Sequence, residues 1–179
     1  MNSSINPFYS IIVVSAILFA SCAKDKKNEL EFYSDLENVK GWTGGKNNEE
    51  TIIKGLAHSG QYISKTDSIF QYGFGFRINL SDLVEQPVKK VKASIWVNVT
   101  DIRSDAGLVV ALDSAGKNIL WASKPIKDFV KKTDEWTEVI SEVEFPQMKT
   151  SKDYSVTAYI WNTGKFPVLS DDIRIEFLK

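Results

Sequence analysis

The sequence is poor in the side chains that many enzymes and metal centres use. It contains one cysteine, Cys22, and one histidine, His58. A single cysteine forms no disulfide within the chain, and zinc sites normally gather several cysteine or histidine ligands. A Ser-His-Asp arrangement would have to use His58, whose surroundings lack the strand-to-helix elbow that presents such a serine. These shortages argue against a zinc site and a serine hydrolase.

An excess of charge of either sign is also missing. The sequence contains 22 Lys and Arg residues and 23 Asp and Glu residues, which gives a formal net charge of −1. A nucleic-acid-binding domain normally shows a basic excess or stripe, so we expect no nucleic-acid partner. A hydrolase or lyase that uses two carboxylates stays open. Its candidates are Asp171 with Asp172, and Glu142 with Glu144, although Val143 between the two glutamates predicts an ordinary strand with a solvated charged face.

The first 21 residues contain no charged side chain. Their apolar run, Ile11 to Ala20, is too short for a membrane-spanning helix, which needs roughly 20 residues, and matches the core of a secretory signal. Cys22 follows Ala20-Ser21 and resembles the lipobox of bacterial lipoproteins, in which the cysteine is acylated and becomes the mature N-terminus. An acylated Cys22 leaves no cysteine nucleophile. The alternative is an ordinary cleaved signal that leaves Cys22 as a free thiol.

These features divide the chain into three parts. We predict a lipoprotein signal peptide over residues 1–21, a polar lipid-anchored tether over 22–28, and one domain over 29–179. Ala23 after the cysteine resembles the choice found in outer-membrane lipoproteins. The expected location is therefore the outer membrane, on its periplasmic face or the cell surface, with the membrane contacted through the lipid.

The domain reads as strands and turns throughout. Large apolar residues alternate with small or polar ones over residues 70–80 and again over 88–99, which is the period of a β-strand. Further strands are predicted over 30–33, 51–54, 61–64, 107–112, 119–122, 136–145, 154–162 and 171–177, and single helical turns over 81–85 and 126–131. About ten short strands favour an all-β fold, a two-sheet antiparallel β-sandwich of the jelly-roll type.

Five short motifs occur in order along this domain. They are Asp35-Leu36-Glu37 before Gly41-Trp42, His58-Ser59-Gly60, Ser94-Ile95-Trp96-Val97, Glu135-Trp136-Thr137 and Asp171-Asp172-Ile173. Together they resemble the galactose-binding-like jelly-roll modules, in particular the carbohydrate-binding modules attached to bacterial glycan-degrading enzymes. The resemblance covers nearly the whole domain and implies a non-catalytic protein that binds a polysaccharide or oligosaccharide. The same fold also serves structural and adhesive roles, so the alternative is a lipoprotein that docks an envelope protein.

The resemblance also implies a structural calcium ion. Side-chain oxygens of Glu37, Asp171 and Asp172, with backbone carbonyls near Ser59, would be its ligands, and Ca²⁺ takes such hard oxygen donors. The alternative is that the two aspartates are satisfied by backbone amides at the entrance of the last strand.

The aromatic residues that alternate out of phase with the core indicate where a sugar would bind. Trp96 and Asn98 point away from the core on the strand over 88–99, and Tyr159 and Trp161 do so on the strand over 154–162. If the two strands share a sheet, these residues form one exposed platform, to which Arg77 adds a hydrogen-bonding group. The alternative is that the aromatics pack beneath a loop.

The remaining aromatic residues are predicted to be structural. Trp42, Trp121 and Trp136 are expected in the core or as loop anchors, and Tyr72, Phe74 and Phe76 in the core. His58 is expected to stabilise its turn.

Overall fold

The computed structural model describes residues 30–40, 42, 48–83, 88–147 and 152–178. The predicted signal peptide, the tether and the lipidation site Cys22 lie outside these residues. Within the described part of the chain, no helix has the length and apolar character needed to cross a membrane.

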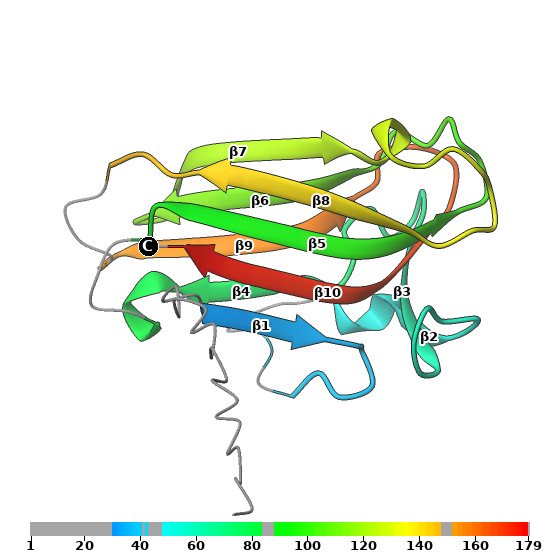
Figure 1. The fold of residues 1–179 in the computed structure, drawn as a ribbon, viewed down its shortest axis with the longest axis horizontal. Helices are drawn as coiled ribbons and strands as arrows, with labels where there is room; N and C mark the ends of the chain where they lie inside the picture. Colours follow the sequence, from blue (N-terminus) through cyan, green and yellow to red (C-terminus); the bar gives the residue numbers. More distant parts are fainter. Residues whose placement is uncertain (1–29, 41, 43–47, 84–87, 148–151, 179) are drawn as a thin grey trace, which may run out of the picture.

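Two antiparallel sheets lie face to face (Figure 1). The six-stranded sheet contains, in order, β2 (Ile52–Lys54), β3 (Tyr62–Thr66), β10 (Val168–Leu178), β5 (Lys90–Val99) and β8 (Thr137–Glu144), with β1 (Leu30–Ser34) also paired to β10. The four-stranded sheet contains, in order, β4 (Phe76–Asn79), β9 (Tyr154–Trp161), β6 (Gly107–Ser114) and β7 (Lys117–Pro125). Short 3-10 turns lie at η1 (Glu49–Thr51), η2 (Leu80–Asp82) and η3 (Ile126–Asp128). The predicted two-sheet antiparallel β-sandwich is confirmed.

The core is built from the inward faces of both sheets. Alternate residues of β5 and of β9 are almost completely buried in one continuous apolar cluster. Phe76 packs against Phe32 and Phe177, with ring centroids 5.0 and 6.0 Å apart, and against Trp42 at 5.3 Å. Burying each such ring contributes about 1.5–3 kcal/mol. Trp42 is therefore a core residue, as expected.

The predicted strand over residues 70–80 is shorter than expected. Only Phe76–Asn79 forms β4, and Tyr72 makes an isolated bridge with Trp161 of β9. The chain before β4 lies so close to β9 that a Cβ at Gly75 would come within 2.6 Å of the Ala158 carbonyl oxygen. Because this segment is not a regular strand, its alternation does not hold: Phe74 is buried, whereas Tyr72 is 49% exposed. The prediction that Tyr72 belongs to the core is wrong.

The last strand, β10, has two partners along one of its edges. Its first residues pair with β3 and its later residues, from Ile173 onward, pair with β1, while β5 follows the other edge. The register shifts between Asp171 and Arg174, and Asp172 has a positive φ of 48°. This bulge places the two aspartates where β1 and β3 meet.

Candidate functional site

The outer face of the four-stranded sheet gathers aromatic side chains. As predicted, Tyr159 and Trp161 of β9 point outward with Thr157. The adjacent β6 presents small residues: Val109 lies opposite Tyr159, and Ala111 lies opposite Trp121 of β7. Val109 and Ala111 are buried although they face outward, because the larger side chains on either side cover them.

Four rings make up this surface, which we call the aromatic face. They belong to Tyr72, Trp121, Tyr159 and Trp161. Trp121 meets Trp161 edge to face, with centroids 5.4 Å apart and planes at 84°, and Tyr72 lies 5.9 Å from Tyr159. Trp121 is 46% exposed, so the face is both ordered by ring contacts and open to solvent.

The hydroxyl of Tyr159 is held within the aromatic face. Burial raises the pKa of Tyr159, and a hydrogen bond from the Trp121 side chain partly opposes that rise. The phenol therefore remains protonated and available as a donor at neutral pH.

One hollow adjoins the aromatic face and a second lies further along the same sheet. The smaller, about 150 Å³, is lined by Tyr72, Tyr159, Thr157, Arg77 and Asn48 over a floor that includes Gly73 and Gly75. The larger, about 800 Å³, lies at the far end of the sheet, and its lining includes Asn79, Asp113, Asp153 and Ser155. Arg77 lines both hollows. The face thus combines flat apolar rings with a small set of polar groups, as ligand sites commonly do.

The expected platform that joined Trp96 and Asn98 to Tyr159 and Trp161 does not exist. Trp96 and Asn98 lie on β5 in the six-stranded sheet, on the opposite outer face of the sandwich. The imidazole of His58 stacks on Trp96, with centroids 3.9 Å apart and planes at 13°. Trp96 is therefore partly covered by the loop that carries His58, and of the five predicted ligand residues only Arg77, Tyr159 and Trp161 share a face.

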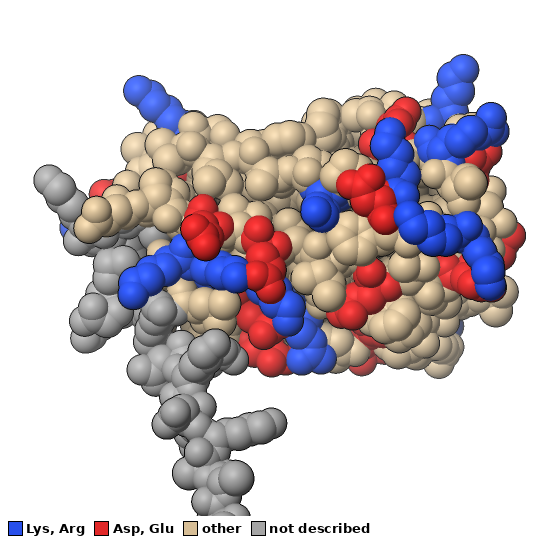
Figure 2. Space-filling view, turned by 45° about the horizontal axis from the view of Figure 1, so that its top comes forward, with Lys and Arg blue, Asp and Glu red and all other residues tan. Residues whose placement is uncertain are grey.

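The rest of the outer face of the six-stranded sheet is charged. Lys92 pairs with Glu176 at 2.7 Å, and the ion pairs Lys90–Glu142 and Arg174–Glu31 lie beside it. In Figure 2 charged side chains of both signs lie next to one another across the visible face. Glu142 and Glu144 are exposed and Val143 is buried, as expected for a solvated strand face. The described part of this face thus carries several ion pairs.

The outward positions of two members of the aromatic face, Tyr72 and Trp121, were not predicted from the sequence. Trp121 was expected in the core or as a loop anchor, but it alternates with Leu120 and Ala122, and both of these pack toward the core. The alternation of that strand therefore carried the signal for an outward Trp121. Tyr72 carried no such signal, because its orientation depends on the irregular backbone before β4.

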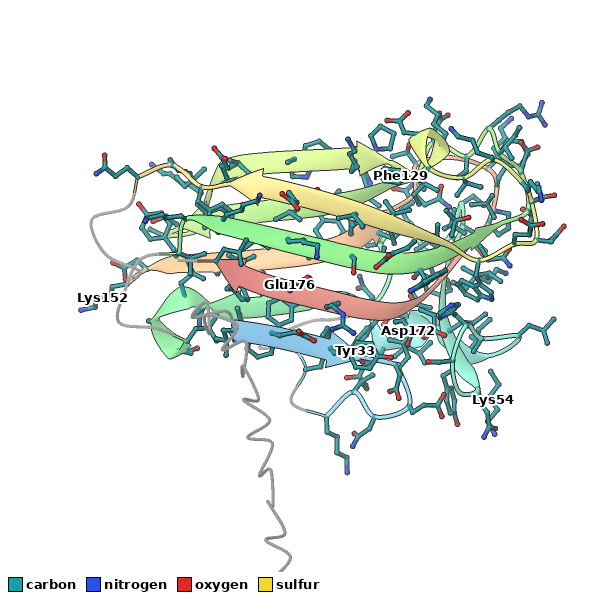
Figure 3. The ribbon with its side chains drawn as sticks, in the orientation of Figure 1. Tyr33, Lys54, Phe129, Lys152, Asp172 and Glu176 are labelled. Carbon is teal, nitrogen blue, oxygen red and sulfur yellow. The ribbon has the colours of Figure 1, made fainter. Side chains whose placement is uncertain are left out.

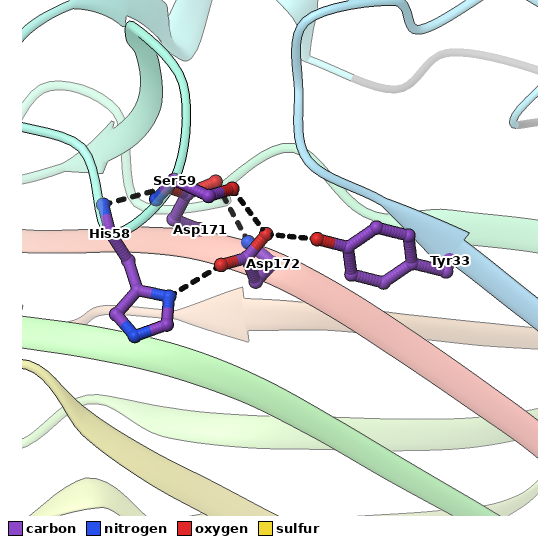
Figure 4. A network of polar contacts seen from close by, with 5 residues as sticks. All are labelled: Tyr33, His58, Ser59, Asp171 and Asp172. Carbon is purple, nitrogen blue, oxygen red and sulfur yellow. Dashed lines mark hydrogen bonds and ion pairs between the residues drawn. The ribbon is translucent and has the colours of Figure 1, made fainter.

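A polar network fills the junction between β1, β3 and β10 (Figure 4). Asp171 accepts hydrogen bonds from three backbone N–H groups, those of His58 (2.9 Å), Ser59 (3.0 Å) and Asp172 (2.8 Å). Asp172 bonds the Nδ1 of His58 at 2.5 Å and accepts bonds from the hydroxyls of Ser59 (2.7 Å) and Tyr33. Figure 3 shows Tyr33 beside Asp172 at the end of β1. The network ties the loop before β3 to the first and last strands, and His58 stabilises its turn as expected.

The network also bears on the expected calcium site. The oxygens of Asp171 and Asp172 face N–H and O–H groups, and Glu37 accepts hydrogen bonds from the backbone N–H groups of Gln61 (2.6 Å) and Tyr62 (2.9 Å). Across the described residues, no three acidic, histidine or cysteine side chains gather as metal ligands. Asp171 is satisfied by backbone amides, as in the alternative, whereas Asp172 is satisfied by the side chains of His58, Ser59 and Tyr33. The calcium site stays a prediction.

Comparison with solved structures places the sandwich among known folds. The xylan-binding domain CBM22-2 of Xyn10C from Paenibacillus barcinonensis superimposes with a TM-score of 0.51 at 16% identity, covering 83% of this chain and 99% of that one. The tandem CBM22-1–CBM22-2 structure of the same enzyme gives 0.52 at 20% identity, covering 84% of this chain and 45% of that one. The chain therefore shares the two-sheet β-sandwich fold of these two structures. No protein-family model and no curated protein sequence matches the chain.

Proposed function

We propose that this protein binds a carbohydrate chain, without turnover, on the aromatic face. One observation carries the proposal: four aromatic rings from three separate segments of the chain meet on one outer face of the sandwich. They belong to Tyr72, Trp121, Tyr159 and Trp161, and the sandwich has the fold of a xylan-binding domain. Flat rings of this kind pack against the C–H faces of sugars. Arg77, Thr157 and the Tyr159 hydroxyl lie beside the rings and supply hydrogen bonds for sugar hydroxyls.

The contrast between the two outer faces supports the choice of face. The six-stranded sheet presents ion pairs such as Lys92–Glu176, and its aromatic residue Trp96 is stacked by His58. A sugar bound there would displace existing partners. The aromatic face requires no such rearrangement, because Trp121 and Tyr72 are already open to solvent.

The N-terminal sequence supports a cell-envelope role for this binding. With Cys22 acylated, the domain would be lipid-anchored at the outer membrane and would hold polysaccharide near enzymes that degrade it. Calcium is not required by this proposal. Because the similar domain of Xyn10C is named as xylan-binding, xylan is the first polysaccharide to test.

A binding screen with variants of both faces tests the proposal. The protein is screened on a glycan array and by calorimetry beside Trp121→Ala, Tyr159→Ala and the matched control Trp96→Ala, each shown to be folded. A central aromatic contact contributes about 2 kcal/mol or more, so we expect Trp121→Ala and Tyr159→Ala to weaken binding about 30-fold. Trp96→Ala should bind like the unmodified protein. Loss of binding only in Trp96→Ala would move the site to the opposite face.

The same protein and its variants also test whether the bound glycan is cleaved and whether the face docks a protein. Release of new reducing ends from any bound glycan would overturn the non-catalytic proposal. The second candidate function, docking of an envelope protein, is favoured by Ile119, which is 48% exposed on the edge strand β7 next to Trp121. It would replace the first if no glycan binds and if Trp121→Glu abolishes co-purification of a specific envelope protein.

A further inference from the structure

Arg77 differs from the other arginines of the chain. There are three, and the other two are paired: Arg103 forms a bidentate contact with Asp101, at 2.9 and 2.5 Å, and Arg174 pairs with Glu31. Arg77 is exposed and has no ion-pair partner within the described part of the chain. Its guanidinium is therefore free to bind an anion.

The position of Arg77 directs that charge at the aromatic face. Arg77 lies on the edge strand β4, in register with Thr157 of β9, and lines the smaller hollow beside Tyr72 and Tyr159. It is the one charged side chain among the described residues that line this hollow. No carboxylate of the described lining competes for it there.

The larger hollow has a different balance. Asp113 and Asp153 line it together with the cationic side chains of Arg77 and Lys152, and Asp113 accepts a hydrogen bond from the Asn118 amide at 3.0 Å. The two carboxylates and the two cations of this lining balance one another. The smaller hollow, in contrast, has the positive charge of Arg77 and no carboxylate among its described lining residues, so of the two hollows it is the one that favours an anion.

We infer that the sugar unit seated in the smaller hollow carries an anionic substituent, which the Arg77 guanidinium binds. The inference rests on the proposed carbohydrate binding and names the ligand class: an acidic polysaccharide, bearing either the carboxylate of a uronic acid or a sulfate ester. A guanidinium presents two parallel N–H groups that match two oxygens of one such anion. The rings of Tyr72 and Tyr159 would hold the sugar while Arg77 selects for its charge.

Matched polysaccharide pairs test this inference. The protein is titrated with glucuronoxylan before and after carboxyl reduction, and with a sulfated galactan before and after desulfation. A hydrogen bond to a charged group contributes about 1.5–3 kcal/mol, so we expect one acidic polymer to bind about 10- to 100-fold more tightly than its neutral form. The pair that shows this preference identifies the anion as carboxylate or sulfate.

Substitutions of Arg77 test whether this side chain causes the preference for the acidic polymer. Arg77→Gln should reduce the acidic-to-neutral ratio to about one, Arg77→Lys should keep part of it because the charge remains without the fork, and the charge-matched control Arg103→Gln should keep it all. Equal weakening of both forms in Arg77→Gln, or equal binding of both forms by the unmodified protein, would overturn the inference and leave carbohydrate binding intact. Binding to none of the four polymers, with the unmodified protein also binding nothing on the glycan array, would instead remove the proposed function.

Discussion

Asp171 holds the loop before β3 onto the last strand, and its removal should destabilise the whole sandwich. The side chain is fully buried although it points to the outer side of its sheet, because residues 55–61 cover it. Its carboxylate accepts three backbone N–H groups, two of them from His58 and Ser59. In Asp171→Ala the backbone N–H groups of His58, Ser59 and Asp172 lose their acceptor; the bond from Asp172 is buried and the other two are partly buried.

The size of the effect follows from the three lost hydrogen bonds. A buried donor left without an acceptor costs about 1–3 kcal/mol. Burial raises the pKa of Asp171, which means that its charge carries a desolvation cost that the substitution relieves, so we take the lower end for each bond. The expected loss is about 3 kcal/mol in the free energy of unfolding, or about 6–12 °C in Tm for a domain of this size.

Calorimetric and urea unfolding of Asp171→Ala beside Asp67→Ala measures this loss. Asp67 also accepts two backbone N–H groups, from Ile69 (2.8 Å) and Phe70 (3.0 Å), but in an exposed turn where water replaces the carboxylate. Its substitution should cost less than about 1 kcal/mol. If Asp171→Ala destabilises the protein no more than Asp67→Ala does, the argument that the buried acceptor holds the loop in place is refuted.

Three further predictions concern Gly75, the loss of stability at alkaline pH, and calcium. Gly75→Ala places a Cβ within 2.7 Å of the Tyr159 Cβ. We therefore expect the free energy of unfolding, measured in urea, to fall by about 1–3 kcal/mol, and glycan binding to weaken. Unchanged stability and binding would contradict the close approach. Burial and the bond to Asp172 raise the pKa of Tyr33 to about 12. The stability that this shift contributes is complete below pH 10 and is lost as the pH rises toward 12, so Tyr33→Phe should flatten the alkaline fall in Tm, and parallel curves would argue against it. Because the carboxylates of the junction face hydrogen-bond donors, calcium and EDTA should give the same Tm within about 1 °C, whereas a clear rise with calcium would restore the metal site.

The class of fold and the direction of most side chains were predictable from the sequence. Alternation with a period of two is a local property of an extended chain, so it correctly placed Tyr159 and Trp161 outward on β9 and Glu142 outward on β8. The alternation of β7 also indicates the outward position of Trp121. Alternation failed at Tyr72, where the chain departs from a regular strand to pass close over β9.

The composition of the candidate site depended on strand pairing, which alternation does not encode. Trp96 and Trp161 both face outward, as predicted, yet β5 and β9 belong to different sheets and the two rings lie on opposite sides of the molecule. Pairing is decided by which strands bury their apolar faces together and by the register between residues far apart in the chain.

The motifs that implied calcium illustrate the same division. The amino-acid sequence alone shows that Tyr33, the His58-Ser59 turn and the Asp171-Asp172 pair are present, that strands surround them, and that the chain folds without an internal disulfide. Which of these side chains contact one another follows only from the folded chain. Asp172 lies 139 positions from Tyr33 in the chain, and a bulge with a positive φ turns its carboxylate toward three donors. Whether a carboxylate binds a cation or accepts hydrogen bonds depends on the groups that surround it in space, and long-range packing sets those groups.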